Sequence, residues 1–326
     1  MTTRRQIIKY AITGPMLLTL GCASDPRSNS KIAQPYSLRD LDWHDANRNR
    51  SVPVRLYLPN VDLSATKIPL IIFSHGIGGS RYGYSYLGRA WATNGFASLH
   101  LQHVGSDRKL WLSGSPFDIV NRLHKAARES EAIARAEDLR FALDQALSGE
   151  LGDLIDRERV IAAGHSYGAN TTLLAAGAKV ERHGKLLDLL DTRIRAAIII
   201  SAPPFYGELS SKQILEPIQI PSLHITATND VIEIPGYFSD AIDRIKIFED
   251  VGSRDKMLAV FSGGSHSIFT DRSGTGGLTL NPKVKVATSK LTSAFLRRVL
   301  NGETDDLRNW PSDYNEILSR FETTIL

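Results

Sequence analysis

The sequence VIAAGHSYGANTTLLAAGA, residues 160–178, places a serine between two symmetrically spaced glycines. An apolar run precedes Gly164, and a run of small, helix-compatible residues follows Gly168. The pattern G-x-S-x-G at such a junction is typical of a sharp strand-to-helix turn that exposes a serine hydroxyl. Side chains at Gly164 and Gly168 would collide with the neighbouring strand or helix. Ser166 is therefore predicted to be a nucleophile, and a helix N-cap in a tight turn is the alternative.

Apolar runs recur along the rest of the chain in a repeated strand–helix pattern. The predicted strands cover residues 52–59, 68–76, 96–103, 159–166, 196–203, 221–230 and 257–266. Most of these runs are unbroken, which is typical of strands buried on both faces of a parallel sheet. Helical periodicity lies between them, over residues 132–147 and from Val286 onward. The sequence predicts one α/β domain over residues 38–326, with a doubly wound, mostly parallel sheet flanked by helices.

A serine hydroxyl needs a neighbouring base, and that base needs an orienting carboxylate. Of the nine histidines, His266 follows the last predicted strand in a Gly/Ser loop and is the predicted base. His224 lies inside an apolar strand and is predicted to pack in the core. Asp230 directly follows the preceding strand and is the predicted carboxylate. Glu233 is the alternative carboxylate, and an Asx turn is the alternative role for Asp230.

A glycine-rich turn follows the first buried strand, in the segment FSHGIGGS at residues 73–80. It predicts an oxyanion hole in which the backbone N–H of Ile77 faces that of Tyr167. Each such donor contributes about 2.7–4 kcal/mol to transition-state stabilisation. The alternative is a glycine-rich turn that only lets the chain cross the sheet.

Two further regions leave alternatives open. Residues 104–126 have few periodic apolar residues and form either a lid over the carboxyl edge of the sheet or an ordinary surface connection. Aromatic residues near them either line an apolar cleft or pack between helices; they are Tyr82, Tyr84, Tyr86, Trp91, Trp111 and Phe117.

The sequence predicts no metal site and no cofactor. His100 and His103 are three residues apart, which places them on opposite faces of a strand. His103 is expected to end that strand rather than to border a pocket. The chain has no zinc cysteine pattern, phosphate loop or dinucleotide fingerprint.

The N-terminal segment TRRQIIKYAITGPMLLTLGC, residues 3–22, resembles a twin-arginine export signal that ends at a lipoprotein processing site. Cys22, the only cysteine of the chain, is the expected lipidated residue and membrane tether. Residues 23–37 are polar and are predicted to form a flexible tether. We therefore expect a periplasmic or membrane-anchored lipoprotein; a tail with a chance arginine pair is the alternative.

The charge of the chain argues against a nucleic-acid partner. The formal net charge is +4 over 326 residues, and Arg4, Arg5 and Lys9 supply three of these charges. No run of five or six basic residues is present.

A family resemblance rests on six segments that occur in the expected order. They are PVRLYLP, PLIIFSHGIGGSRYGYSYLGRAWATNGFASLHLQHVGSD, RAEDLRFALDQ, GHSYGA, TATND and GGSH. Together they resemble α/β-hydrolases of the predicted dienelactone hydrolase group, akin to platelet-activating-factor acetylhydrolase and to chlorophyllase- or lipase-like serine esterases. The resemblance covers about residues 38–300. It implies for Ser166, His266 and Asp230 the roles of nucleophile, base and acid, and for the Ile77 and Tyr167 amides that of oxyanion donors.

The sequence thus predicts a serine-dependent carboxylic ester hydrolase that works through an acyl-enzyme. The expected substrate is a small-molecule or lipid ester with a short-chain or lipid-type acyl group. True dienelactone hydrolases use a cysteine nucleophile, and Ser166 stands at that position here. An amidase or peptidase on the same fold and a non-catalytic surface binding module are the alternatives.

Overall fold

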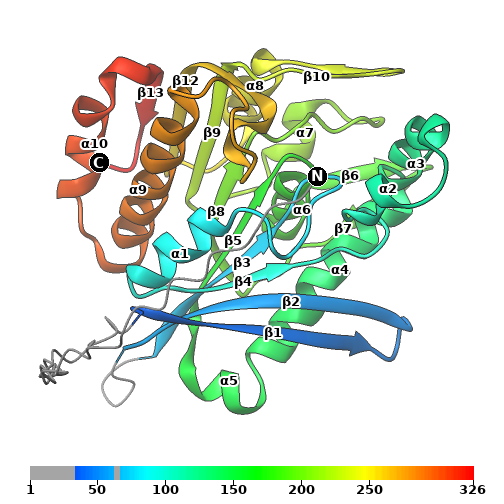
Figure 1. The fold of residues 1–326 in the computed structure, drawn as a ribbon, viewed down its shortest axis with the longest axis horizontal. Coiled ribbons are helices and arrows are strands. Elements are labelled where there is room, and N and C mark those ends of the chain that lie inside the picture. The colour runs from blue at the N-terminus through cyan, green and yellow to red at the C-terminus, as the bar shows by residue number, and fades with distance from the viewer. Residues whose placement is uncertain (1–33, 62–66) are drawn as a thin grey trace, which may run out of the picture. The chain divides into compact units, whose positions relative to one another are not determined.

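The computed structural model describes residues 34–61 and 67–326, and residues from Gln34 onward form one compact unit (Figure 1). The predicted export signal, Cys22 and most of the predicted tether lie outside the described residues. The first strand, β1 (Tyr36–Asp45), begins two residues before the predicted domain boundary. It begins there because Tyr36 already pairs with Pro59 of β2 (Arg50–Pro59).

A nine-stranded sheet forms the centre of the fold, in the order β1-β2-β4-β3-β5-β8-β9-β12-β13. Its remaining strands are β3 (Ile68–Ser74), β4 (Ala97–Leu101), β5 (Ile155–His165), β8 (Ile194–Ile200), β9 (Ser222–Asn229), β12 (Lys256–Ser265) and β13 (Leu318–Thr323). From β4 to β12 all neighbouring strands are parallel, whereas β1, β2 and β13 join the edges in antiparallel pairs. The predicted mostly parallel sheet is confirmed.

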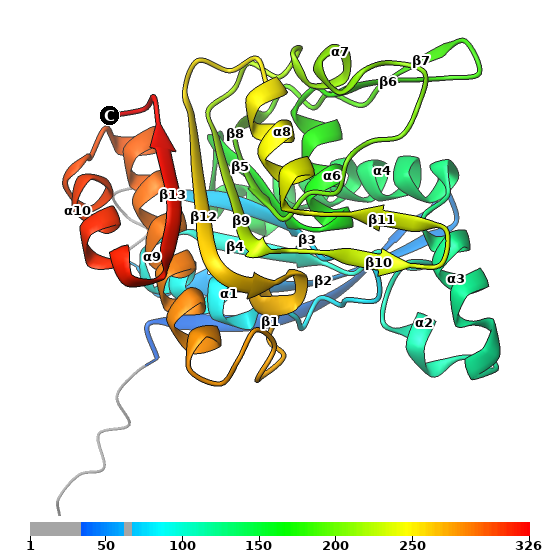
Figure 2. The same ribbon diagram turned by 90° about the horizontal axis from the view of Figure 1, so that it is seen from above.

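Helices cover both faces of this sheet (Figure 2). On one face α1 (Ser85–Thr93), α9 (Leu280–Asn301) and α10 (Asp305–Asp313) share one buried apolar cluster with Ile71 and Phe73 of β3. The other face is covered by α4 (Glu129–Ala146), α5 (Gly149–Leu154), α6 (Tyr167–Ala176), α7 (Ser211–Leu215) and α8 (Ala241–Asp250). There Leu70 and Ile72, the alternate residues of β3, face Leu139 and Leu143 of α4. The unbroken apolar runs are therefore explained by burial on both faces.

Several short elements lie outside the predicted pattern. The edge strands β1 and β13 and the two hairpins, β6 (Lys179–Arg182) with β7 (Lys185–Asp188) and β10 (Ile232–Ile234) with β11 (Tyr237–Ser239), were not predicted. Their side chains are largely exposed or half-buried, so they lack the apolar runs of the central strands.

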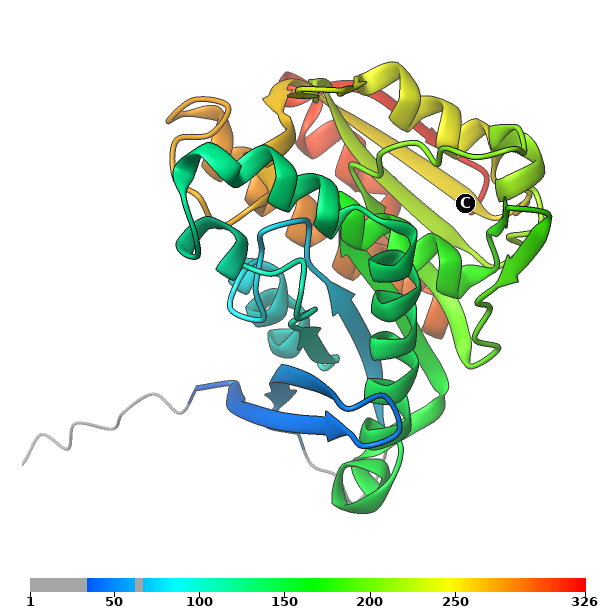
Figure 3. The same ribbon diagram turned by 90° about the vertical axis from the view of Figure 1, so that its right-hand side faces the viewer.

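Residues 104–126 form short helices rather than an extended loop (Figure 3, teal). They comprise α2 (Lys109–Leu112), the 3₁₀ turn η1 (Pro116–Asp118) and α3 (Ile119–Ala126). Two more 3₁₀ turns, η2 (His266–Phe269) and η3 (Asn315–Ile317), follow β12 and α10. Within the described residues, no helix is both long and apolar enough to cross a bilayer.

The packing of α4 on the sheet gives a stability prediction. Leu143 is fully buried against the sheet, and truncation would leave a cavity as well as remove buried apolar surface. Leu143→Ala is expected to lower the free energy of unfolding by about 2–5 kcal/mol. Urea denaturation measures this change. Leu278→Ala, at an 85% exposed leucine, is the matched control; an equal loss there would contradict the assignment of Leu143 to the core.

Candidate active site

The turn between β5 and α6 is a strained elbow built around Ser166. This serine has φ 55° and ψ −126°, a backbone conformation that L-residues adopt only at a cost of about 1–3 kcal/mol. A Cβ on Gly164 would lie 2.2 Å from the carbonyl oxygen of Gly168, and one on Gly168 would lie 1.9 Å from that of Ser74. Both glycines are thus required by close backbone contacts, as their spacing predicted.

The structure brings Ser166, His266 and Asp230 into one hydrogen-bonded chain. The Ser166 Oγ lies 2.8 Å from the His266 Nε2, and the His266 Nδ1 lies 2.7 Å from the Asp230 Oδ1. His266 opens η2 directly after β12, and Asp230 directly follows β9. The carboxylate that meets His266 is therefore that of Asp230, whereas Glu233 lies exposed in β10.

The surroundings of Asp230 keep its carboxylate ionised. Burial of the carboxyl raises its pKa, but the hydrogen bond and charge of His266 and the charge of Arg244 outweigh this and hold the pKa well below its usual range. The Arg244 Nε lies 3.6 Å from Oδ1, and the Thr226 hydroxyl donates to Oδ2 at 2.8 Å. Since an ionised carboxylate only accepts, His266 carries its proton on Nδ1 and presents Nε2 to the serine hydroxyl as an acceptor.

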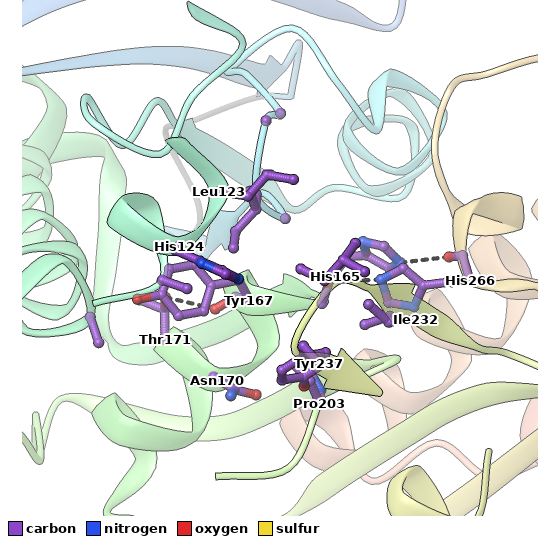
Figure 4. A pocket seen from close by; sticks show the side chains of 18 of the residues that line it. Leu123, His124, His165, Tyr167, Asn170, Thr171, Pro203, Ile232, Tyr237 and His266 are labelled. Carbon is purple, nitrogen blue, oxygen red and sulfur yellow. Dashed lines mark hydrogen bonds between the residues drawn. The ribbon is translucent and has the colours of Figure 1, made fainter. Parts of the chain in front are cut away.

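His165, which precedes the serine, anchors the loop that carries His266. Its Nε2 donates to the backbone carbonyl of His266 at 3.0 Å (Figure 4). Its Nδ1 accepts from the Tyr84 hydroxyl at 2.8 Å. Burial, followed by the charge of His266, lowers the pKa of His165 to about 3, so the ring is neutral. The Tyr84 hydroxyl in turn accepts from the Gly76 N–H at 3.4 Å.

The sequence analysis did not predict this role of His165. For Tyr84 it gave two alternatives, lining an apolar cleft or packing between helices. Tyr84 does both, since it lines the cavity and packs on Phe73 with ring centroids 4.8 Å apart. A histidine beside the elbow serine was the available sequence signal. Nothing local marks Tyr84, because its partner is 81 residues away.

The predicted oxyanion donors both lie in the wall of the cavity that contains Ser166. Tyr167 is the first residue of α6, so its N–H has no acceptor within the helix. The turn that carries Ile77 is held by a hydrogen bond from the Gly78 N–H to the Ser106 carbonyl at 2.8 Å. A Cβ on Gly76 would lie only 3.1 Å from the Ser166 Cβ, which shows how closely this turn approaches the elbow.

A cavity of about 850 Å³ opens in front of Ser166 and His266. Figure 4 shows His266, Tyr167 and Leu123 among its lining side chains. Its wall includes Trp111, Leu112 and Leu123 from residues 104–126, together with residues of the β6–β7 and β10–β11 hairpins. The Trp111 indole N–H donates to the Gly78 carbonyl at 3.0 Å, so the α2 segment lies directly over the glycine-rich turn. Of the two alternatives for residues 104–126, the structure therefore favours a covering segment at the site.

The remaining histidines of interest are structural. His103 is fully buried two residues after β4, between the Ser74 hydroxyl and the Asp138 carboxylate, each at 3.1 Å. His224 is buried and packs on Phe248 with ring centroids 5.5 Å apart, as predicted for a core residue. Among the residues described, no group of three or more histidine, cysteine or acidic side chains is arranged to hold a metal ion.

Comparisons with known proteins agree with this architecture. The family model described as "Platelet-activating factor acetylhydrolase, isoform II" matches residues 44–108. The platelet-activating factor acetylhydrolase of Cavia porcellus is 26% identical over 292 residues, which are 76% of this chain and 60% of that protein. The chain thus spans about 60% of the length of this relative.

A solved structure is also similar. The ferulic acid esterase from Streptomyces cinnamoneus superposes with a TM-score of 0.60 at 20% identity, over 83% of this chain and 92% of that one. The parallel sheet, the serine elbow and this superposition define an α/β-hydrolase fold. The sequence similarities to platelet-activating factor acetylhydrolases agree with the resemblance that the sequence motifs predicted.

The lowered pKa of Asp230 gives a pH prediction. Because the folded-state pKa lies below the unfolded value of about 3.9, the ionised carboxylate stabilises the fold above that pH. This contribution is lost as the pH falls below about 4 toward the folded-state pKa. The stability difference between wild type and Asp230→Asn is therefore expected to be largest near neutral pH and to shrink in acid.

Urea denaturation of both proteins over a pH series measures this difference, with Asp313→Asn, at an exposed aspartate, as the control. A difference that stays constant or grows below about pH 4 would contradict the assigned environment of Asp230.

Proposed function

We propose that this protein is a carboxylic ester hydrolase in which Ser166 is the nucleophile, His266 the general base and Asp230 the orienting acid. The observation that carries the proposal is the continuous hydrogen-bonded chain from the Ser166 Oγ through His266 to a buried carboxylate, open to a large cavity. The similar proteins are an acetylhydrolase and an esterase, which supports the same class of reaction.

The proposed reaction proceeds by two acyl transfers. The Ser166 Oγ attacks the ester carbonyl while His266 Nε2 takes its proton, and the Asp230 carboxylate stabilises the resulting imidazolium. The carbonyl oxygen becomes an oxyanion that accepts hydrogen bonds from the Ile77 and Tyr167 amides. His266 then protonates the departing alcohol, which leaves an acyl-enzyme. Water, deprotonated by His266, attacks this ester and releases the acid and the free serine.

The character of the cavity supports apolar ester substrates. Aliphatic and aromatic side chains dominate its wall, among them Trp111, Leu123, Leu174, Phe205 and Ile232. Such a wall favours an alkyl or aryl group on the acyl or alcohol side through burial of apolar surface. We therefore propose short-chain acyl or lipid-type esters as substrates.

The first test uses p-nitrophenyl esters of increasing acyl length. Wild type is expected to hydrolyse them with a clear optimum in chain length, and Ser166→Ala to lose about 10³-fold or more of kcat because the nucleophile is absent. Ser80→Ala is the matched control, since Ser80 lines the same cavity without touching His266. Turnover of Ser166→Ala at the wild-type rate would exclude this nucleophile, and a folded wild type inactive on every ester would contradict the proposal.

A second test addresses the anchor formed by Tyr84. Tyr84→Phe removes the hydroxyl that donates to the buried Nδ1 of His165. The proton of His165 can then move from Nε2 to Nδ1, which would break the hydrogen bond from Nε2 to the His266 carbonyl. We expect kcat to fall about tenfold with little change in KM, because His266 is displaced rather than the cavity.

Tyr86→Phe is the control for this test. It removes one tyrosine hydroxyl that donates to the neighbouring Phe269 carbonyl at 3.1 Å, outside the His165 chain. A kcat of Tyr84→Phe equal to that of wild type would show that the Tyr84 hydroxyl has no role in positioning His266.

A further inference from the structure

A fully buried arginine lies behind the candidate oxyanion hole. Arg135, on α4, has no exposed surface, and its guanidinium makes three hydrogen bonds in three directions. Nε donates to the Thr171 hydroxyl at 3.0 Å, Nη1 donates to the Ser106 hydroxyl at 2.8 Å, and Nη2 donates to the backbone carbonyl of His75. The planar fork of arginine suits such divergent acceptors, and a lysine ammonium does not reproduce it.

These partners belong to the two segments that carry the oxyanion donors. His75 lies two residues before Ile77, and Ser106 accepts the Gly78 N–H through its own carbonyl. Thr171 lies on the first turns of α6, and its hydroxyl donates to the Tyr167 carbonyl at 3.1 Å. One guanidinium thus connects the glycine-rich turn to the start of α6.

Arg135 also contacts Tyr167 directly. Its guanidinium carbon lies 4.7 Å from the centroid of the Tyr167 ring, within the range of a cation–π contact. Tyr167, whose amide is the second proposed oxyanion donor, is therefore held by the same guanidinium that bonds the glycine-rich turn at His75.

The Glu131 carboxylate meets Arg135 only through Ser106, whose hydroxyl accepts from Arg135 and donates to the Glu131 Oε1 at 2.9 Å. Among the described residues, no carboxylate oxygen lies within 4.0 Å of its guanidinium nitrogens. Burial lowers the pKa of Arg135 to about 10, which still leaves it a cation at neutral pH. A buried cation without a close counter-ion is costly, and it favours negative charge that develops nearby.

We propose that Arg135 is the positioning residue of the oxyanion hole: it sets the separation of the Ile77 and Tyr167 amides, and its field favours the oxyanion. This inference rests on the proposed esterase function and deepens it. Arg135 lies behind both segments and is absent from the cavity wall, so it acts on the transition state and leaves substrate binding unchanged.

The experiment compares two substitutions that separate geometry from charge. Arg135→Lys keeps the charge and loses the fork, whereas Arg135→Met loses both. With a p-nitrophenyl ester we expect kcat to fall about tenfold in Arg135→Lys and about a hundredfold or more in Arg135→Met, with KM changed less than about threefold.

A trifluoromethyl ketone supplies a readout that a purely structural role would not move. Its adduct with the serine carries an oxyanion at the proposed hole, so its Ki should rise by the same factor as kcat/KM falls. Circular dichroism and thermal unfolding establish that each variant is folded. Should both variants at position 135 fail to fold, Ser106→Ala removes a single acceptor of Arg135 outside the cavity wall and is expected to show a smaller parallel change.

Arg193→Lys is the matched control, because Arg193 also makes forked contacts, with Asp191 and Asp144, at the amino-terminal end of β8. It should leave kcat and Ki unchanged. If wild type is active, Ser166→Ala is inactive, and a folded Arg135→Lys or Ser106→Ala keeps the wild-type kcat and Ki, this inference is wrong and the esterase proposal stands. An inactive wild type that forms no adduct overturns the esterase function and this inference with it.

Discussion

The geometry of the site depends on a close backbone contact between the start of α6 and the end of β3. Gly168 approaches the Ser74 carbonyl so nearly that a Cβ would lie 1.9 Å from its oxygen. Because β3 leads directly into the glycine-rich turn, this contact fixes the elbow serine and the turn with the Ile77 amide as one unit. The strained φ of Ser166 persists because both flanking glycines let the surrounding backbone close around it.

The parallel sheet then supplies the other two members of the hydrogen-bonded chain. Ser166, Asp230 and His266 follow β5, β9 and β12, whose carboxyl ends share one edge of the sheet, with β8 between β5 and β9. Residues far apart in sequence meet there without any local pairing between them. The short elements at the same edge, the two hairpins and the α2–α3 segment, add the apolar wall of the cavity.

The parts that could be predicted from sequence are those written in local patterns. Unbroken apolar runs marked the central strands, paired glycines marked the elbow, and position after a strand singled out Asp230 and His266. The edge strands and hairpins could not be predicted because half-exposed strands carry no unbroken apolar run. The hydrogen bonds of Tyr84 with His165 and of Arg135 with its three acceptors could not be predicted for another reason. They join residues 29 to 81 positions apart, and only the fold brings those residues together.

The polar cluster behind the glycine-rich turn follows from the same constraint. Arg135, Asp138 and His103 are all fully buried, although an apolar core of the same shape would avoid the cost of desolvating them. His103, held by Asp138, bonds the Ser74 hydroxyl, and Arg135 bonds the His75 carbonyl. Ser74 ends β3 and His75 begins the glycine-rich turn. An apolar core would hold this segment by shape alone and allow small displacements, whereas directional bonds to a planar guanidinium and an imidazole specify one position. The buried polar groups therefore lie where a small displacement would change the separation between Ser166 and the proposed oxyanion donors, the Ile77 and Tyr167 amides.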